Sequence, residues 1–543
     1  MAKQSHDLSR AAGAYRERRG RHPPPGFKEW FNYAQAHDAV IVEDLFDQIY
    51  HDLTPFWALE PKALRHWSQH FEYSIGIRNG KATLKTNEQH PFLDQWFDLV
   101  STIQHLLPDV DIPLNFMDET RVVAPFEDIN EAVREERSSR HVAHLLEVVT
   151  QPSAVKDESG DEPLLDAQWI REGQFWDIAR VACSNDTPAR TAPAMIEFSN
   201  PPPMPSSFPD GSYHGYVHNW TQAKDLCLQP DLRGTHGTFI SQLSLSITHS
   251  LVPIFGHSKL SVNNDILMPA PMYWTDDPFY SGGEDTHGDE WGKKQGQVMW
   301  RGTASGGRNS RDNWKAFHRH RFVSMVNGTA VRLAEQDEGQ GPNFDLHAYK
   351  DYHLTATKYM DLGTWLNDAV DVGFTFLECW PPTKNAQCPY TDPYFQVKEK
   401  IKMQDQYAYK FLPDIDGNSY SGRYRGFLRS TSLPIKATVY SEWHDSRLVP
   451  WLHFVPMHNS FVDIYGILDY FIGSSVPVIS SQGEWIIEGA HDDQAKKIAL
   501  AGKEWADKVL RKEDMLIYVM RLLMEYARLC DDHRARLGFI GDL

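Results

Sequence analysis

The sequence predicts an α/β fold with a parallel sheet in the second half of the chain. Strand-like runs at 297–302, 409–416, 433–440 and 451–457 alternate with helix-like runs at 311–327, 420–430 and 460–473. Such alternation is typical of a parallel sheet whose crossover helices cover its faces. In the run at 460–473, Phe461, Ile464, Leu468 and Phe471 share one face, which predicts an amphipathic helix packed on that sheet.

The first half has a less regular pattern and predicts a separate domain. Helical periodicity occurs at 27–37, 40–53 and 60–71, a strand candidate covers 111–123, and the segments 151–162 and 201–211 predict loops. A break rich in glycine and charge near 281–297 suggests a boundary. Because 543 residues exceed one ordinary core, we expect four parts. These are a polar tether (1–30), an N-terminal domain (31–290), a second α/β domain (291–490) and C-terminal helices (491–543).

Composition excludes several partners. The net charge of −19 argues against nucleic acid, which needs a basic face, and against an acidic membrane surface. The sequence has no run of 18 apolar residues to span a bilayer and no signal-peptide core. Two interpretations stay open: a cytosolic protein, or a lumenal domain whose membrane anchor lies outside this sequence.

Cysteines and sequons bear on the compartment. There are five cysteines, without a C-x-x-C pair, so a structural zinc site is not expected. Cys379 and Cys388 bracket a loop that could close as a disulfide or stay reduced. Three Asn-x-Thr sequons, at Asn185, Asn219 and Asn327, favour the secretory pathway modestly.

A turn between a predicted strand and helix carries the first candidate site. Gly417 permits a tight turn after the strand 409–416, Asn418 follows it, and Ser419 and Ser421 are placed to cap the next helix. Arg423 in the first turn could fork onto phosphate or carboxylate oxygens. The alternative is a capped surface helix with solvated arginines.

A second cluster follows the strand 297–302. It combines glycines with hydroxyl and guanidinium side chains, and it is neither a Walker A loop nor G-x-G-x-x-G. Its candidate ligand-binding residues are Arg301, Thr303, Ser305 and Arg311. Two such clusters at strand ends of one domain indicate a diphosphate-bearing ligand, whereas a flexible loop with solvated arginines is the alternative.

Carboxylates at strand ends are candidates for acid–base chemistry. Asp118, followed by Glu119 and Arg121, ends the strand candidate of the first half, and Asp265 has a similar position. Acids end strands often without any catalytic role. Glu442 could hold a ribose or pair with Arg447.

One acidic pattern could hold a metal. Asp414 and Asp416 form a D-x-D that could hold Mn²⁺ across a diphosphate. The pattern is frequent by chance and recurs at Asp109 and Asp111, so Mn²⁺ is possible and no metal ligand is assigned.

Three segments together resemble glycosyltransferase family 90. They are "WRGTASGGRNSRDNWKAFHRHRFV", "YAYKFLPDIDGNSYSGRYRGFLRS" and "YSEWHDSRLVPWLHFVPM". The family includes fungal β-1,2-xylosyltransferases and animal protein O-glucosyltransferases. The segments "RHPPPGF", "ACSNDTPAR" and "LRGTHGTFI" look like the fungal branch. The resemblance implies a GT-B-like fold, with two Rossmann-type domains facing across a cleft and C-terminal helices packing back.

The resemblance also implies roles for single residues. Asp118 matches the family's catalytic base, although Glu119-Thr120 replaces the Tyr-Pro that follows it in the animal enzymes. Arg423 matches the diphosphate-binding arginine, and Glu442 stands where a ribose contact is expected. The family's other donor-binding loop contains Arg301, Thr303, Ser305 and Arg311.

The predicted function is therefore inverting transfer of a sugar. The first hypothesis is xylose from UDP-xylose, added in β-1,2 linkage to a mannose-containing glycan. The enzyme would reside in the Golgi or another secretory lumen as a type II membrane protein. Alternatives are a transferase for UDP-glucose or another UDP-sugar, a glycoside hydrolase, and a glycan-binding protein without catalysis. Since arginines and helix N–H groups can stabilise a leaving diphosphate, a metal is not strictly required.

Overall fold

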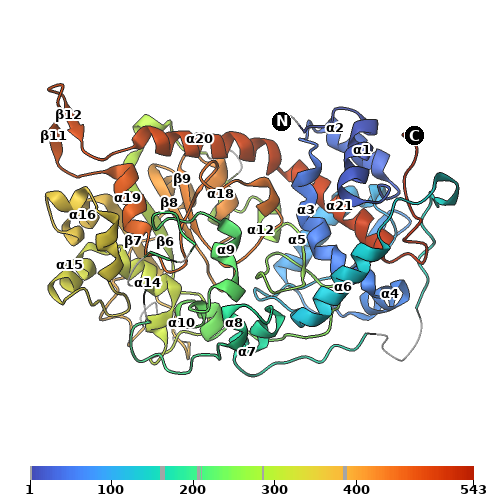
Figure 1. Cartoon of the computed structure of the whole chain (residues 1–543), viewed down its shortest axis with the longest axis horizontal. Helices are drawn as coiled ribbons and strands as arrows, with labels where there is room; N and C mark the ends of the chain where they lie inside the picture. The colour runs from blue at the N-terminus through green and yellow to red at the C-terminus, as the bar shows by residue number, and fades with distance from the viewer. Residues whose placement is uncertain are drawn as a thin grey trace.

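The structure is a computed structural model that describes residues 3–158, 165–202, 204, 208–209, 211–283, 287–382 and 388–543 (Figure 1). Its centre is a parallel sheet with the strand order β10-β9-β8-β6-β7. The strands are β6 (Gln295–Thr303), β7 (Val370–Phe376), β8 (Tyr409–Ile415), β9 (Leu433–Ala437) and β10 (Val455–Pro456). The predicted parallel α/β sheet is confirmed. Its central strands are buried because helices cover the sheet, as parallel sheets require.

Helices of the second half pack around this sheet. They are α14 (His318–Met325), α15 (Gly328–Gln336), α16 (Leu362–Ala369), α17 (Met403–Gln406), α18 (Tyr424–Arg429), α19 (Ile464–Ile472) and α20 (Asp492–Val509). Phe461, Ile464, Leu468 and Phe471 are all buried, as predicted for the amphipathic run. The helix predicted at 311–327 is shorter, because a 3-10 turn at Trp314–Ala316 precedes α14.

The strand predicted at 451–457 is also shorter. Only Val455–Pro456 joins the sheet, since Trp451 has a φ of 63° that no extended strand allows. Beyond α19, a hairpin of β11 (Pro477–Ile479) and β12 (Trp485–Ile487) projects from the body of the molecule (Figure 1).

The strands of the first half pair mainly antiparallel. β1 (Ser74–Arg78), β2 (Lys81–Lys85) and β3 (Val110–Pro113) form a sheet in the order β2-β1-β3, and β4 (Phe255–Gly256) pairs parallel with β5 (Ile266–Leu267). Asn79 and Gly80 both have positive φ, the geometry of a tight hairpin turn. That turn makes β1 and β2 antiparallel, so this sheet differs from the Rossmann-type sheet expected in the first half.

The strand candidate at 111–123 is wrong beyond Pro113, because the chain continues as a loop. The longer helices of the first half are α1 (Leu8–Arg19), α2 (Phe27–Ala36), α3 (Asp47–Leu53), α4 (Pro61–His70), α5 (Pro91–Ile103) and α6 (Phe126–Ser139). Short helices follow: α7 (Phe175–Ala179), α8 (Pro188–Thr191), α9 (Trp220–Lys224), α10 (Leu232–Thr235), α11 (Gly237–Ile240), α12 (Pro271–Trp274) and α13 (Pro278–Ser281).

The predicted tether over residues 1–30 is wrong. Residues 8–19 form α1, in which Ala11, Ala12 and Tyr15 are buried. The Tyr15 hydroxyl donates to Glu525 of the C-terminal helix α21 (Lys512–Leu529) at 2.9 Å. Figure 1 shows α21 among the N-terminal helices. Polar composition hid this contact, because the helix buries only a narrow face.

Two large hydrophobic cores organise the chain. The first draws residues from Ala11 to Cys530 and therefore includes both ends of the sequence, and the second runs from Trp291 to Ala499. The C-terminal helices thus divide between the two, since α20 contributes to both and α21 to the first. The domain boundaries named above remain predictions.

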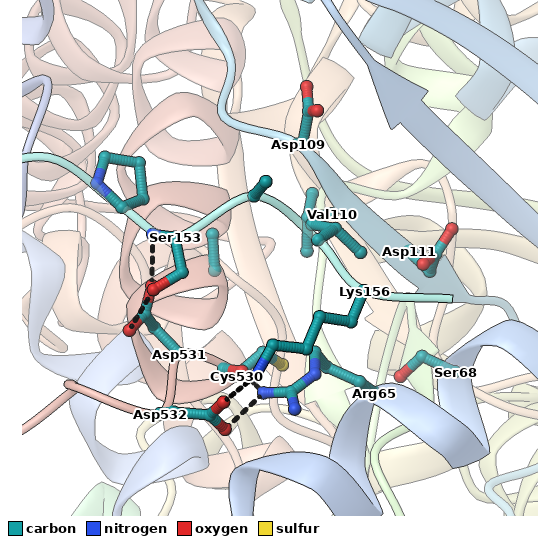
Figure 2. Close-up of a pocket in the computed structure, with 14 residues that line it drawn as sticks. Arg65, Ser68, Asp109, Val110, Asp111, Ser153, Lys156, Cys530, Asp531 and Asp532 are labelled. Carbon is teal, nitrogen blue, oxygen red and sulfur yellow. Dashed lines mark hydrogen bonds and ion pairs between the residues drawn. The ribbon is translucent and has the colours of Figure 1, made fainter. Parts of the chain in front are cut away.

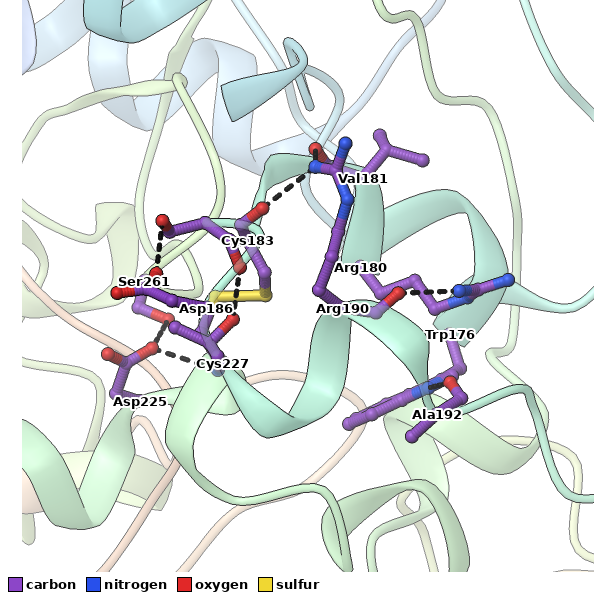
Figure 3. The surroundings of a disulfide bond; sticks show 12 residues. Trp176, Arg180, Val181, Cys183, Asp186, Arg190, Ala192, Asp225, Cys227 and Ser261 are labelled. Atoms are coloured by element: carbon purple, nitrogen blue, oxygen red, sulfur yellow. Dashed lines mark hydrogen bonds between the residues drawn. A yellow bond between two sulfur atoms is a disulfide. The ribbon is translucent and has the colours of Figure 1, made fainter. Parts of the chain in front are cut away.

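Two disulfides are formed in the structure. Cys183 and Cys227 are joined across 44 residues with their Cα atoms 5.3 Å apart, and Arg190 donates to the Cys183 carbonyl beside them (Figure 3). Cys379 and Cys388 close the loop for which the sequence left the redox state open. Cys530 is buried and unbridged.

A small cavity lies where residues 152–156 cross the end of α21. Arg65, Ser153 and Asp532 line it, and Arg65 pairs with Asp532 at 2.8 Å (Figure 2). Its volume of about 30 Å³ has room for a water molecule and not for a sugar. Among the described helices none combines the length and hydropathy that a bilayer crossing requires.

Candidate active site

The strand order places a switch point between β6 and β8. From β6 the chain moves to β7 on one side of it, and later to β8 on its other side. Loops at the carboxyl ends of such neighbouring strands separate and leave room for a ligand. The two loops that leave these strands contain the two candidate clusters of the sequence.

The loop after β6 depends on two glycines. Gly306 and Gly307 have φ values of 122° and 116°. A Cβ atom on Gly307 would lie 2.2 Å from the Ser241 carbonyl oxygen, so no other residue fits. Both glycine N–H groups donate to Asn418 Oδ1, at 3.1 and 3.0 Å. Two N–H groups that converge on one oxygen resemble an anion-binding nest.

Asn418 also reaches the first half of the chain. Its Nδ2 donates to Asp118 Oδ2 at 3.4 Å, across 300 residues of sequence. Asp118 is partly buried in the loop after β3. The structure therefore brings together the predicted base and the turn that follows β8.

Arg319 ties the two strand ends together. Its guanidinium donates to the carbonyl oxygens of Thr303 and Ile415 and to Ser305 Oγ, at 3.1, 3.0 and 2.7 Å. It also donates to the Asp416 carbonyl at 2.6 Å. Burial, reinforced by the charge of Arg423, lowers the pKa of Arg319 to about 10. Its hydrogen bonds fix Thr303 and Ser305 in place. A Cβ atom added to Gly417 would lie 3.2 Å from Nη2 of Arg319.

Arg423 is a second buried cation of the site. Nη1 donates to the Arg301 carbonyl at 2.7 Å, whereas Nη2 has no hydrogen-bond partner among the residues that the structure describes. Burial lowers the Arg423 pKa against the opposing charge of Asp414. A buried guanidinium with an unused donor is a natural contact for an anion.

The predicted cap at Ser419 and Ser421 is wrong. The helix α18 starts at Tyr424, so Arg423 is its N-cap residue, and no side chain caps it. The Ser419 carbonyl accepts from Gly417 at 2.7 Å and closes the turn instead. Ser421 Oγ is buried and lacks a partner within the described chain.

Three other residues predicted to bind the sugar donor face protein partners or solvent in the structure. The Arg301 guanidinium binds both carboxylate oxygens of Asp371 on β7, at 2.8 and 2.7 Å. Arg311 is exposed. Glu442 accepts from the Tyr273 hydroxyl at 2.7 Å, and the described contacts give it no pair with Arg447.

The D-x-D carboxylates are buried, and one oxygen of each is engaged. Asp414 pairs with Lys436 at 2.7 Å, and Asp416 accepts from the Val439 N–H at 2.9 Å. His236 lies 3.3 Å from the same Asp416 oxygen. Because an ammonium already balances Asp414, the pair does not fit a metal site. Within the described residues, no group of three or more His, Cys, Asp or Glu side chains could hold a metal ion.

The other candidate residues of the first half, Glu119, Arg121 and Asp265, have structural partners. Glu119 accepts from the backbone N–H of Ser244 at 2.9 Å, and burial raises its pKa. Arg121 lies over the Trp169 ring at 4.1 Å. Asp265 is fully buried and accepts from two backbone N–H groups, those of Arg121 and Val122, while burial raises its pKa to about 6. Asp265 thus holds the loop that carries Asp118.

Two further site residues were not singled out from the sequence. Arg319 lies in the run "HRH" near the end of a segment that resembles the family, but no motif assigned a role to its guanidinium. Glu378 follows β7, and burial raises the pKa of its carboxyl group. The charge of Arg319 and a hydrogen bond from Thr303 oppose this rise, whereas the charge of Asp118 adds to it. Both become visible only when the ends of β6, β7 and β8 are brought together.

Comparison with known proteins gives matches for part of the chain. The Glycosyl transferase family 90 profile matches residues 385–534. Protein O-glucosyltransferase 2 of Danio rerio is 26% identical over 137 residues, which are 25% of this chain and 24% of that protein. The O-glucosyltransferase rumi homolog of Aedes aegypti is 27% identical over 165 residues, 30% of this chain and 35% of that protein.

A longer match is weaker. Protein O-glucosyltransferase 1 of Rattus norvegicus is 21% identical over 287 residues, 51% of this chain and 57% of that protein. Each match thus covers less than two thirds of the relative's length. The matched segment of the chain contains the strands β8, β9 and β10 together with Asn418 and Arg423. Residues 385–534 thus match the family that the sequence resembles, glycosyl transferase family 90.

Proposed function

We propose that the chain is an inverting glycosyltransferase that takes its sugar from a UDP-sugar. One observation carries the proposal: Asn418 contacts Asp118 of the first half and the Gly306–Gly307 loop of the second. A carboxylate thereby faces a loop whose N–H groups converge on an oxygen. This is the arrangement that a base and a phosphate site need for transfer in one step.

Each residue has a distinct task in this proposal. Asp118 accepts the proton of the attacking acceptor hydroxyl as the new glycosidic bond forms. Arg423 donates its unused Nη2 to the leaving diphosphate, whose negative charge grows as the bond to the anomeric carbon breaks. Arg319 holds the carboxyl ends of β6 and β8 in register, so it is a positioning residue.

The donor sugar is the finer part of the proposal. The fungal-type segments favour xylose in β-1,2 linkage to a mannose-containing glycan. The names of the O-glucosyltransferase relatives favour glucose, weakly, because the matches are partial. The two donors differ by one hydroxymethyl group, so UDP-xylose remains the first candidate and UDP-glucose the second.

The proposed compartment is the lumen of the Golgi or another part of the secretory pathway. Two disulfides support it, since disulfides persist in oxidising compartments. The charge of −19 supports an enzyme whose acceptor is a glycan rather than nucleic acid. A type II anchor outside this sequence belongs to the same proposal.

A donor panel tests the proposal. UDP-xylose, UDP-glucose, UDP-galactose and UDP-glucuronate are each offered with a mannobioside, with and without Mn²⁺, and UDP release and product mass are followed. We expect one donor to give a pentose or hexose addition, with the same rate in the lanes that lack Mn²⁺. Failure to bind UDP would contradict the transferase, and a glycan-binding protein would take its place.

A further inference from the structure

A groove lined by aromatic rings shares no lining residue with the candidate active site. Its volume is about 410 Å³, and it lies between residues 213–218, Trp451 and the helices α19 and α20. Tyr213, Trp451 and Tyr470 are 65%, 37% and 44% exposed. Large aromatic side chains that stand together at a surface usually have something to cover them.

Trp451 is held in this groove at a conformational cost. Its φ of 63° is unfavourable for a bulky side chain. Its indole N–H donates to the Val217 carbonyl at 2.8 Å, and its backbone N–H donates to Phe454 at 2.8 Å. Strain that the surrounding hydrogen bonds maintain points to a use for the exposed ring.

Asn219 stands next to the groove. Its chain neighbour His218 lines the groove, and Asn219 itself is exposed. As the N-cap of α9, it accepts the Gln222 N–H on Oδ1 at 3.2 Å. Its Nδ2 makes no hydrogen bond to the part of the chain that the structure describes. Thr221 completes the Asn-Trp-Thr sequon.

We propose that Asn219 carries an N-linked oligosaccharide whose first sugars lie on the Trp451 groove. In the transfer, Asn219 Nδ2 forms a bond to the anomeric carbon of an oligosaccharide held on a polyprenol diphosphate. The bond from that carbon to the diphosphate oxygen breaks, the lipid diphosphate leaves with the electron pair, and Nδ2 loses one proton. Oδ1 is untouched, so the helix cap survives.

The groove suits a sugar chemically. The C–H faces of sugar rings are apolar and stack on aromatic rings, while their hydroxyls need polar partners at the rim. Tyr213, Trp451 and Tyr470 supply the rings, and His218 and Gln494 supply polar groups. The two disulfides support passage through the oxidising compartment in which such transfer occurs.

The other sequons provide contrasts. Asn185 Nδ2 donates to Glu127 at 3.1 Å, so its amide is already engaged. Asn327 caps α15 through Oδ1, which accepts from the Ala330 N–H at 3.0 Å, and it does not line the Trp451 groove. Thr221 and Thr329 are both exposed, so their loss removes a sequon without disturbing the core.

The test expresses the whole chain through the secretory pathway of a eukaryotic host, behind a cleavable signal sequence. Peptide mass spectrometry measures the occupancy of Asn219, and hydroxyl-radical footprinting measures oxidation of Trp451 and Tyr470. The variants are Thr221→Ala, Thr221→Ser, which keeps the sequon, and Thr329→Ala as the matched control. Trp485, 72% exposed on the β11–β12 hairpin, is the internal reference.

We expect Thr221→Ala to lose the glycan on the Asn219 peptide and to raise the oxidation of Trp451 and Tyr470 severalfold. Thr221→Ser and Thr329→Ala should leave both oxidation rates as in the parent, and Trp485 should not change in any variant. An unmodified Asn219 in the parent would overturn the proposal. Equal oxidation with and without the glycan would overturn the seating on the groove.

Discussion

Asp118 is the residue on which the proposed chemistry depends most directly. Its carboxylate contacts only an amide in the described site, and Asn at this position would still accept that hydrogen bond. We expect Asp118→Asn to bind UDP as the parent does but to transfer sugar about 10²–10⁴-fold more slowly, the range for loss of a general base. Isothermal titration and a UDP-release assay measure the two properties.

The neighbouring acid supplies the matched control for that variant. The Glu119 carboxylate accepts a hydrogen bond from the Ser244 N–H and makes no contact with Asn418 among the described hydrogen bonds. Glu119→Gln should therefore keep transfer within severalfold of the parent. Normal turnover in Asp118→Asn would assign the base to another carboxylate, and Glu378 would be the first to substitute.

Arg423 should decide the affinity for the diphosphate. Lysine keeps the charge but cannot reproduce the two-pronged donor, since Nη1 holds the Arg301 carbonyl and Nη2 is unused. Hydrogen bonds to charged groups contribute about 1.5–3 kcal/mol, so Arg423→Lys should weaken UDP binding about 10- to 100-fold. Titration with UDP measures the change.

Arg311→Lys is the control for the arginine, because that side chain is exposed. It should leave the Kd for UDP unchanged. Thermal unfolding of both variants shows whether either has lost its fold. A Kd for Arg423→Lys equal to that of the parent, in a folded protein, would remove Arg423 from the donor site.

At the residue scale, motifs predicted positions better than orientations. Gly417, Asn418 and Arg423 follow a buried strand and a turn, and the structure places them at the switch point. Arg301 also stands in a glycine-rich cluster, yet its side chain leaves β6 toward Asp371 on the adjacent strand. Local spacing contains no information about a cross-strand partner 70 residues away.

At the element scale, a buried ion pair fixes α3 to the strands of the first half. Asp52 accepts from Lys259 at 2.6 Å and from the Leu267 N–H of β5 at 2.8 Å. Burial would raise the Asp52 pKa, but Lys259 and His51 together outweigh it and the pKa is lowered. Asp52→Asn leaves an uncompensated ammonium, so we expect a loss of about 3–5 kcal/mol in the free energy of unfolding at pH 7.

The sign of the pH dependence follows from the lowered pKa. The stabilisation by Asp52 is present above the carboxylate pKa of the unfolded chain, about 3.9, and is lost as the pH falls through the folded value. Urea denaturation at pH 7 and at lower pH should therefore show the Asp52→Asn deficit shrinking below about pH 4. Asp44→Asn, which breaks surface pairs with Lys3 and Arg18, should cost less than about 1 kcal/mol at either pH.

Elements were predictable where a local signal specified them. The face formed by Ile464, Leu468 and Phe471 predicted α19, whereas the turn at Asn79 and Gly80 gave a hairpin that the periodicity alone had not indicated. Strand lengths were less predictable. Trp451 breaks its strand because tertiary hydrogen bonds hold it at positive φ, and no local propensity reports that.

At the scale of the whole molecule, alternation of strands and helices was enough to predict the parallel sheet but not the path of the chain ends. The helix α21 returns to the first core and packs on α1, so residues at opposite ends of the sequence share one interior. Arg521 of α21 lies over the rings of Tyr15 and Trp30, 4.6 and 4.7 Å from their centroids. Contacts across 500 residues leave no periodic trace in the sequence.

This closure predicts that the N-terminal helix is required for stability rather than serving as a tether. The Tyr15 hydroxyl donates to Glu525 and accepts from Arg528 at 2.6 Å, and all three side chains are buried. Tyr15→Phe removes two charge-assisted hydrogen bonds, so we expect it to lower the free energy of unfolding by about 2 kcal/mol.

Deletion of residues 1–20 should cost more, because it also uncovers the apolar face of α21. Thermal unfolding and size-exclusion chromatography measure both variants, with Asp44→Asn as the control at the same surface. If the deleted chain unfolds at the same temperature as the parent and stays monodisperse, α1 contributes nothing to the first core, and the polar segment is a tether after all.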